Sequence, residues 1–203
     1  MTRSELFALM TTGMATVAGS VMVAYAGMLG ADYAGHLLTA SLLSAPGGLL
    51  LAKVMIPETG TPLTAGSRGA DIEDTAVNVF DAAANGAIAG LRLAGYVGAM
   101  LIAFVALVAL ANDALGALGG LVGIENLSFQ GILGLVFAPL AWLMGVPAGE
   151  ATKVGSLLGV KTVLNEFLAY QQLAVLVKDG EISRRAAVLA SYALCGFANF
   201  GSL

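Results

Sequence analysis

The stretch Gly159-Val160-Lys161-Thr162-Val163-Leu164-Asn165-Glu166-Phe167-Leu168-Ala169-Tyr170 places two charges and an amide between apolar segments. No charge occurs in residues 126–149 before it, or between Phe167 and Val177 after it. An ionisable side chain in hydrocarbon costs about 3 kcal/mol on insertion scales, so such a residue is usually retained because it is paired or because it has a function. The pattern favours a polar binding site near the middle of a membrane. The alternative is a buried Lys161–Glu166 ion pair that only holds helices together.

The composition is that of a membrane protein. Hydrophobic residues make up 58% of the 203 residues and charged residues only 11%, whereas soluble domains are about 25% charged. The net charge of −4 argues against nucleic acid as a partner. The single cysteine, Cys195, and the single histidine, His36, provide neither a disulfide nor a metal cluster. Without a metal-ligand set or a usable Ser-His-Asp arrangement, the sequence does not favour an enzyme.

Two apolar segments open the chain, and each is long enough to cross a bilayer. The first, Leu6–Ala31, carries threonine, serine and glycine residues in its middle. Small polar residues allow helices to pack closely, and they also occur where a helix is broken to expose its carbonyl groups. Composition alone favours close packing here. The second segment, Tyr33–Ala52, contains Pro46, which removes a backbone donor and predicts a kink.

The middle of the chain alternates polar and apolar regions. A turn-rich connection starts at Pro57, and acidic and amide residues then recur at helical spacing from Asp71 to Asn85. This spacing predicts an amphipathic helix that lies at the membrane interface. A further span is expected over Leu93–Asn112, followed by a glycine-rich loop that reaches residue 125.

The last third of the chain predicts helices of half length. The segments that flank the quoted stretch are too short to cross alone, and re-entrant hairpins are built from such pieces. After a polar turn, Ser183 can cap a helix that glycines interrupt at Gly196-Phe197-Ala198-Asn199. The pattern is similar to Gly13-Met14-Ala15-Thr16 in the first segment, and paired interruptions of this kind indicate a transporter's binding site. Because the chain stops inside an uncharged stretch, we expect it to be a fragment.

The quoted stretch resembles the G-x-K-x-x-x-N-E-F-V-A-Y signature of the concentrative nucleoside transporter family, with Leu168 in place of Val. Gly196-Phe197-Ala198-Asn199 matches that family's G-F-A-N segment. The region from Ser4 to Val21 is similar to its broken helix, and Pro46-Gly47-Gly48-Leu49 through Ile56-Pro57-Glu58-Thr59 also fits. The resemblance covers the whole chain, as the C-terminal half of a protein about twice as long.

This resemblance implies an all-α integral membrane fold of transmembrane helices, with a re-entrant helical hairpin, broken helices and one interfacial amphipathic helix. By the resemblance, 1–56 holds transport-domain helices, 57–92 the connection and interfacial helix, 93–125 a scaffold span and its loop, 126–146 a short apolar helix, 147–177 the re-entrant hairpin and 178–203 a second, truncated broken helix. The implied activity is cation-coupled uptake of nucleosides across the plasma membrane by a multi-pass homotrimer, with a sodium ion or a proton as the coupling ion and no cofactor.

The resemblance also implies roles for individual residues. Glu166, Asn199 and Ser202 would bind the ribose hydroxyls, Phe197 and Val21 would flank the sugar and base, and Thr16 and Val17 would offer oxygens to a sodium ion. Gly159, Lys161 and Asn165 belong to the supporting motif. Phe200-Gly201-Ser202 departs from the commoner Leu-Ser-Ser of the family. The alternative function is that of a non-transporting membrane scaffold or interaction module, in which the Lys161–Glu166 pair is structural.

Overall fold

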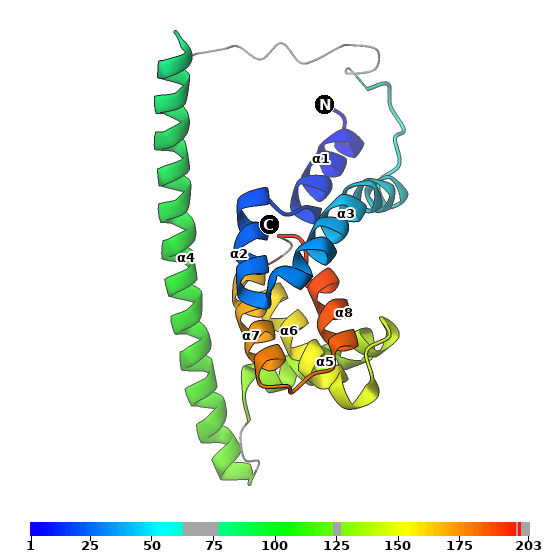
Figure 1. The fold of residues 1–203 in the computed structure, drawn as a ribbon, viewed down its shortest axis with the longest axis vertical. Coiled ribbons are helices and arrows are strands. Elements are labelled where there is room, and N and C mark those ends of the chain that lie inside the picture. The colour runs from blue at the N-terminus through cyan, green and yellow to red at the C-terminus, as the bar shows by residue number, and fades with distance from the viewer. Residues whose placement is uncertain (63–76, 124–126, 198, 200–203) are drawn as a thin grey trace.

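The computed structural model describes residues 1–62, 77–123, 127–197 and 199, and within these ranges it contains helices and no β-strand (Figure 1). The helices are α1 (Arg3–Ala15), α2 (Gly19–Leu29), α3 (Ala34–Met55), α4 (Val79–Val122), α5 (Phe129–Leu143), α6 (Ala151–Val163), α7 (Glu166–Lys178) and α8 (Arg184–Leu194), with short 3-10 turns at Ala31–Tyr33 and Ala148–Glu150. Three stretches, Arg3–Leu29, Ala31–Met55 and Val79–Leu121, are long and apolar enough to cross a membrane. The all-helical expectation is therefore confirmed.

The first apolar segment is broken between α1 and α2. Thr16 and Ala18 have extended backbones, and the N–H of Val17 donates a hydrogen bond of 3.2 Å to the hydroxyl of Ser41 on α3. The preference for an unbroken, closely packed helix, drawn from composition, was wrong, because a side chain of α3 supplies the hydrogen bond that the interrupted helix loses. Close packing also occurs, since a Cβ added at Gly48 of α3 would lie 3.1 Å from the Cβ of Ala15.

The long helix α4 covers most of three segments that were predicted separately: the amphipathic helix, the span Leu93–Asn112 and the loop after it. It begins after Asn78, whose side chain accepts a hydrogen bond from the N–H of Asp81, and it continues for 44 residues. The boundary expected at Arg92 and the loop expected over residues 113–125 were therefore wrong, because the chain has no proline between residues 79 and 122 to end the helix. Residues 71 and 74 of the amphipathic pattern lie outside the described residues, and the interfacial placement stays a prediction.

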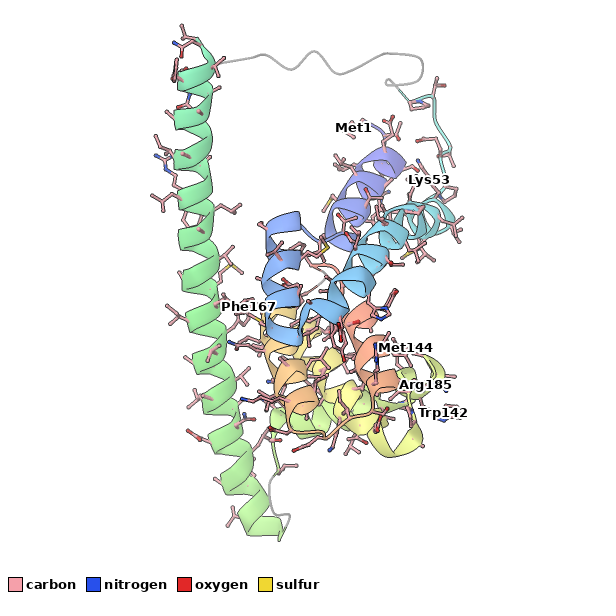
Figure 2. All side chains as sticks on the ribbon, viewed as in Figure 1. Met1, Lys53, Trp142, Met144, Phe167 and Arg185 are labelled. Atoms are coloured by element: carbon pink, nitrogen blue, oxygen red, sulfur yellow. The ribbon has the colours of Figure 1, made fainter. Side chains whose placement is uncertain are left out.

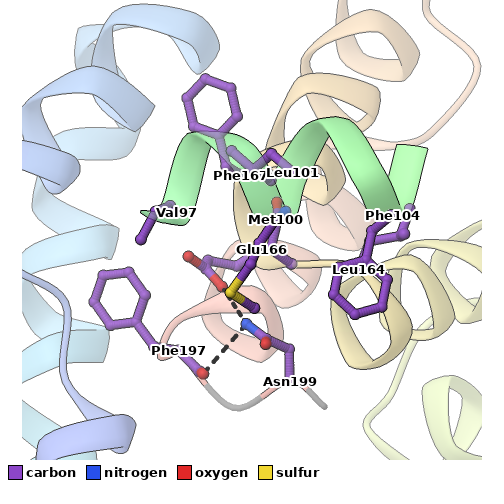
Figure 3. Close-up of a pocket in the computed structure, with 10 residues that line it drawn as sticks. Val97, Met100, Leu101, Phe104, Leu164, Glu166, Phe167, Phe197 and Asn199 are labelled. Atoms are coloured by element: carbon purple, nitrogen blue, oxygen red, sulfur yellow. Dashed lines mark hydrogen bonds between the residues drawn. The ribbon is translucent and has the colours of Figure 1, made fainter. Parts of the chain in front are cut away.

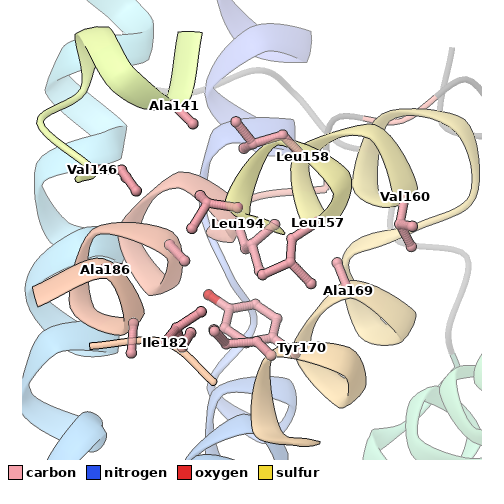
Figure 4. Close-up of a cluster of buried hydrophobic side chains, with 14 of the residues drawn as sticks. Ala141, Val146, Leu157, Leu158, Val160, Ala169, Tyr170, Ile182, Ala186 and Leu194 are labelled. Carbon is pink, nitrogen blue, oxygen red and sulfur yellow. The ribbon is translucent and has the colours of Figure 1, made fainter. Parts of the chain in front are cut away.

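Helix α4 stands beside the other helices, and many of its large apolar side chains are exposed (Figures 1 and 2). The remaining helices form a bundle whose apolar core comes mainly from α2, α5, α6, α7 and α8 (Figure 4). Leu157, Tyr170 and Leu194 are fully buried in this core. Trp142 is exposed on the outer surface of α5 (Figure 2).

Helices α5 and α6 touch through their main chains. A Cβ added at Gly155 would fall 2.5 Å from the carbonyl oxygen of Gly134 and 2.7 Å from the nitrogen of Ala138. A Cβ added at Gly159 would overlap the side chain of Leu133. Inside a membrane, helices associate through such close packing of small residues, because lipid tails are as apolar as the side chains.

The quoted stretch forms the tip between α6 and α7, where the chain reverses at Leu164 and Asn165 (Figure 1). The Asn165 side chain caps α7 by accepting a hydrogen bond of 2.9 Å from the N–H of Leu168. Ser183 caps α8 as predicted, and the Glu150 carboxylate accepts hydrogen bonds from both the N–H and the hydroxyl of Ser183. The helical pair α6–α7 lies within the segment 147–177, and the expected re-entrant hairpin there stays a prediction.

Candidate functional site

Glu166 is a buried carboxylate at the first position of α7. Its exposed fraction is 5%, and it follows the Asn165 cap directly. A negative charge is favoured here, because the unpaired N–H groups of a helix N-terminus carry partial positive charge. The phenol of Tyr25 donates to Oε1 and the amide of Asn199 donates to Oε2, each over 3.4 Å. Both bonds are long, so the carboxylate keeps the capacity to accept shorter bonds from a ligand.

A cavity of about 230 Å³ opens beside this carboxylate (Figure 3). Asn165, Glu166 and Asn199 supply its polar groups, and apolar and aromatic side chains supply the rest: Val97, Met100, Leu101, Phe104, Leu164, Phe167 and Phe197. The first four of these belong to α4, so the long helix forms one wall of the cavity. An apolar cavity with a few convergent polar groups is the usual form of a site for a small organic molecule.

The end of the last helix brings Phe197 and Asn199 to this cavity. Helix α8 stops at Leu194, and Gly196 takes the positive φ of +98° that favours glycine. The Asn199 amide donates to the carbonyl of Phe197 as well as to Glu166, over 3.4 Å in both cases (Figure 3). An amide carries both donor and acceptor atoms and a carboxylate carries two acceptors, so side chains of these two types can together bind vicinal hydroxyl groups.

The other residues expected at the site lie around it or outside the described residues. Val21 on α2 packs against the apolar core and is not among the residues that line the cavity. The Thr16 hydroxyl donates to the carbonyl of Thr12 over 3.4 Å, next to the break that also contains Val17. Ser202 lies outside the described residues. In the structure Glu166, Asn199 and Phe197 line one cavity, and Phe197 also contacts Met14, just before the break that contains Thr16 and Val17. The roles of all these residues in binding stay predictions.

The Lys161–Glu166 ion pair that the alternative function required is absent. Ion pairs within the described ranges join Lys53 to Glu58 and Lys153 to Glu181. Lys161 instead donates hydrogen bonds to two backbone carbonyl groups at the end of α8. The physical reason is geometric, because the chain reverses at Leu164 and the two side chains leave from opposite arms of the helical pair.

Sequence reasoning missed Tyr25. Its ring stacks on Tyr170 with 4.0 Å between centroids, and the Tyr170 phenol donates a hydrogen bond of 2.6 Å to the carbonyl of Ser191. The stack therefore fixes the phenol that contacts Glu166. The available signal was a phenol in the largely apolar α2, since a buried tyrosine hydroxyl usually finds a partner.

We expect the change Tyr25→Phe to weaken ligand binding at Glu166 by about 3- to 10-fold, because it removes one hydrogen bond worth about 1 kcal/mol and keeps the ring stack. The measurement is the dissociation constant of the ligand for the purified complete protein that contains this chain. Tyr33→Phe is the matched control, since the ring of Tyr33 lies against His36 and away from the cavity. Equal affinity in the Tyr25 and Tyr33 variants would contradict a role for the Tyr25 hydroxyl.

Comparison with known proteins gives a consistent result. The family described as "Na+ dependent nucleoside transporter C-terminus" matches residues 36–203. The chain is 49% identical, over its whole length, to half of a Bacillus subtilis protein described as the uncharacterized transporter YutK. It is 46% identical to the nucleoside permease NupC of Helicobacter pylori, again over its whole length and 48% of that protein. The human solute carrier family 28 member 3 is 40% identical over all of this chain and 31% of its own length.

Solved structures agree with these relatives. The structure of CNTnw in an inward-facing substrate-bound state superposes with a TM-score of 0.84 and 46% sequence identity, covering all of this chain and 47% of that one. The chain thus spans about half the length of the bacterial relatives it matches and about a third of the human one.

Proposed function

Because the chain belongs to the concentrative nucleoside transporter family, we propose that it forms the C-terminal part of a carrier that takes up nucleosides together with a cation. The observation that carries this proposal is the pairing of a buried carboxylate and an amide, Glu166 and Asn199, at one apolar cavity. A nucleoside presents vicinal hydroxyl groups on its ribose and an aromatic base. The carboxylate accepts hydrogen bonds from hydroxyl groups, and the amide both donates and accepts.

The apolar walls of the cavity suit the remainder of a nucleoside. Phe197 from the end of α8 and Phe167 from α7 offer ring surfaces, and Val97 and Met100 offer aliphatic surface from α4. Aromatic faces stack with nucleobases without strong preference for one base. We assign to Glu166 and Asn199 the ribose hydroxyls, with Ser202 assisting, and to Phe197 and Val21 contacts that flank the sugar and base.

We place the coupling cation at the break between α1 and α2. Carbonyl groups at the end of a broken helix are the oxygen ligands that membrane carriers offer to sodium. The Thr16 hydroxyl donates to the carbonyl of Thr12, which leaves its oxygen able to act as an acceptor, and the Val17 N–H donates to the Ser41 hydroxyl. Oxygens of Thr16 and Val17 would therefore hold the sodium ion. Proton coupling through the Glu166 carboxylate is the second form of the same proposal.

We further propose that the carrier is a multi-pass protein of the plasma membrane and assembles as a homotrimer, as the family resemblance implies. Helix α4 is the expected scaffold span, because it stands beside the bundle and contributes only a wall to the cavity. In this arrangement the bundle of α1–α3 and α5–α8 is the part that carries the substrate.

Uptake of radiolabelled uridine into proteoliposomes tests this function in the complete protein that contains this chain. We expect saturable, concentrative uptake that requires an inward cation gradient and that other nucleosides inhibit. Uptake that follows the sodium gradient selects sodium, and uptake that ignores sodium and follows the pH gradient selects the proton. The absence of saturable nucleoside uptake under both gradients would reject the proposal.

A further inference from the structure

The two helix breaks of this chain meet at one point. The N–H of Phe197, just after α8, donates a hydrogen bond of 2.7 Å to the carbonyl oxygen of Met14 near the end of α1. A Cβ added at Gly196 would lie 2.9 Å from the carbonyl oxygens of both Met14 and Ala15. The C-terminal ends of α1 and α8 therefore approach each other directly, with main chain against main chain.

The close approach of the two helix C-termini concentrates negative electrostatic potential between them. The last carbonyl groups of a helix have no partner within the helix, and they carry the negative end of the helix dipole. At the end of α1, the N–H of Phe197 donates to the carbonyl oxygen of Met14. At the end of α8, the ammonium group of Lys161 donates to the carbonyl oxygens of Ala193 over 3.0 Å and Cys195 over 3.2 Å. A lysine at this position satisfies the last carbonyl groups of the helix and offsets the negative end of its dipole.

The helical pair α6–α7 thus contacts the end of α8 with both of its arms. Lys161, in the last turn of α6, holds the carbonyls before Gly196. Glu166, in the first turn of α7, accepts a hydrogen bond from Asn199 after Gly196. The segment that carries Phe197 and Asn199 is therefore fixed at both its beginning and its end by two charged side chains of one motif.

We propose that Lys161 is a positioning residue for the nucleoside site, because its ammonium group holds the end of α8 by hydrogen bonds. Its ammonium group holds the Ala193 and Cys195 carbonyls and thereby sets the place of Phe197 and Asn199 opposite Glu166. Of the two breaks, the one after α8 receives the positive charge of a side chain, Lys161. The one after α1 is where the proposed coupling cation would bind. This inference rests on the proposed function for the identity of the ligand.

Substitutions that separate charge from hydrogen bonding test this role in the complete protein. Lys161→Gln keeps a donor and loses the charge, whereas Lys161→Arg keeps both. Lys153→Gln is the matched control, because Lys153 lies on the same helix and forms an exposed ion pair of 2.9 Å with Glu181. We measure the KM and maximal rate of uridine uptake, and the rise in melting temperature that uridine causes in the purified protein.

The expected result is a KM at least about tenfold higher in Lys161→Gln, since hydrogen bonds from a charged donor to two carbonyl groups are replaced by weaker, neutral ones. The uridine-induced rise in melting temperature should shrink with it. Lys161→Arg should stay within about threefold of the unmodified protein, and Lys153→Gln should not differ from it, because an exposed ion pair contributes little. An unchanged KM in Lys161→Gln would overturn the proposal.

Folding and function failures remain distinguishable in this design. If Lys161→Gln does not accumulate, the proposal requires that Lys161→Arg restores both the amount of folded protein and the KM. An arginine variant that fails in either respect overturns the role of a charged hydrogen-bond donor at the end of α8. If the unmodified protein itself takes up no nucleoside, the proposed function fails, whatever the Lys161 variants do. The melting temperature without ligand then still reports whether the charge supports the end of α8.

Discussion

Nucleoside uptake by the complete protein is expected to fall about 100-fold or more when Glu166 is changed to glutamine. Glutamine has nearly the same shape but no charge, and its amide can accept on only one atom. Two charge-assisted hydrogen bonds to ribose hydroxyls, each worth about 1.5–3 kcal/mol, would be weakened or lost together. Since the carboxylate is buried and has no ion-pair partner among the described residues, its removal leaves no opposite charge unpaired.

The measurement is initial uptake of radiolabelled uridine in cells or proteoliposomes, normalised to the amount of transporter in the membrane. Glu181→Gln is the matched control, because the Glu181 carboxylate is exposed and pairs with Lys153 far from the cavity. We expect both variants to reach the membrane in similar amount. Unimpaired uptake by the Glu166 variant would remove the carboxylate from the substrate site and with it the carrier proposal for this cavity.

The second large effect is expected on folding, from Gly155→Ala. The new methyl group would lie 2.5 Å from the carbonyl oxygen of Gly134 and 2.7 Å from the nitrogen of Ala138, so α5 and α6 would have to separate. Overpacking of this kind costs about 1–3 kcal/mol, and the upper end applies here because the opposing atoms belong to the backbone and cannot rotate away. A loss of about 3 kcal/mol lowers the ratio of folded to unfolded protein about 100-fold.

The experiment compares the melting temperature and the yield of monodisperse protein for Gly155→Ala and Gly27→Ala. Gly27 lies in α2 with no heavy atom within 4 Å of an added Cβ, so its change should leave stability unaltered or slightly raise it. A Gly155 variant as stable as the Gly27 variant would show that α5 and α6 can separate at little cost, contrary to the packing described here.

The sequence predicted the local features of this fold well. The reversal at Asn165 and the cap at Ser183 each depend on residues within a few positions, and their polar pattern is visible in an apolar chain. The break near Thr16 followed from the family resemblance, whereas composition had favoured close packing. Glu166 and Asn199 could be paired only through the family resemblance, because they are 33 positions apart. The extent of α4 was missed, since acidic residues and glycines suggest boundaries that a long continuous helix does not need to respect.

Partners from distant parts of the chain were beyond the sequence pattern. Tyr25 reaches Glu166 across 141 positions, and Lys161 reaches carbonyl groups that every residue type carries equally. Charge spacing suggested that Lys161 would pair with the nearest acid, and it ignored the reversal of the chain between them. A carbonyl group that lacks a partner leaves no mark in a sequence, so the role of Lys161 emerges only from the folded arrangement.

The glycine contact between α5 and α6 limits how the protein can rearrange. Side chains at an interface can change rotamer and let two helices slide, but main-chain atoms in contact have no alternative rotamer and cannot move aside. Helices α5 and α6 must therefore move together as one rigid unit. Any opening or closing around the carboxylate has to be taken up by α7, by the end of α8 or by the wall that α4 provides.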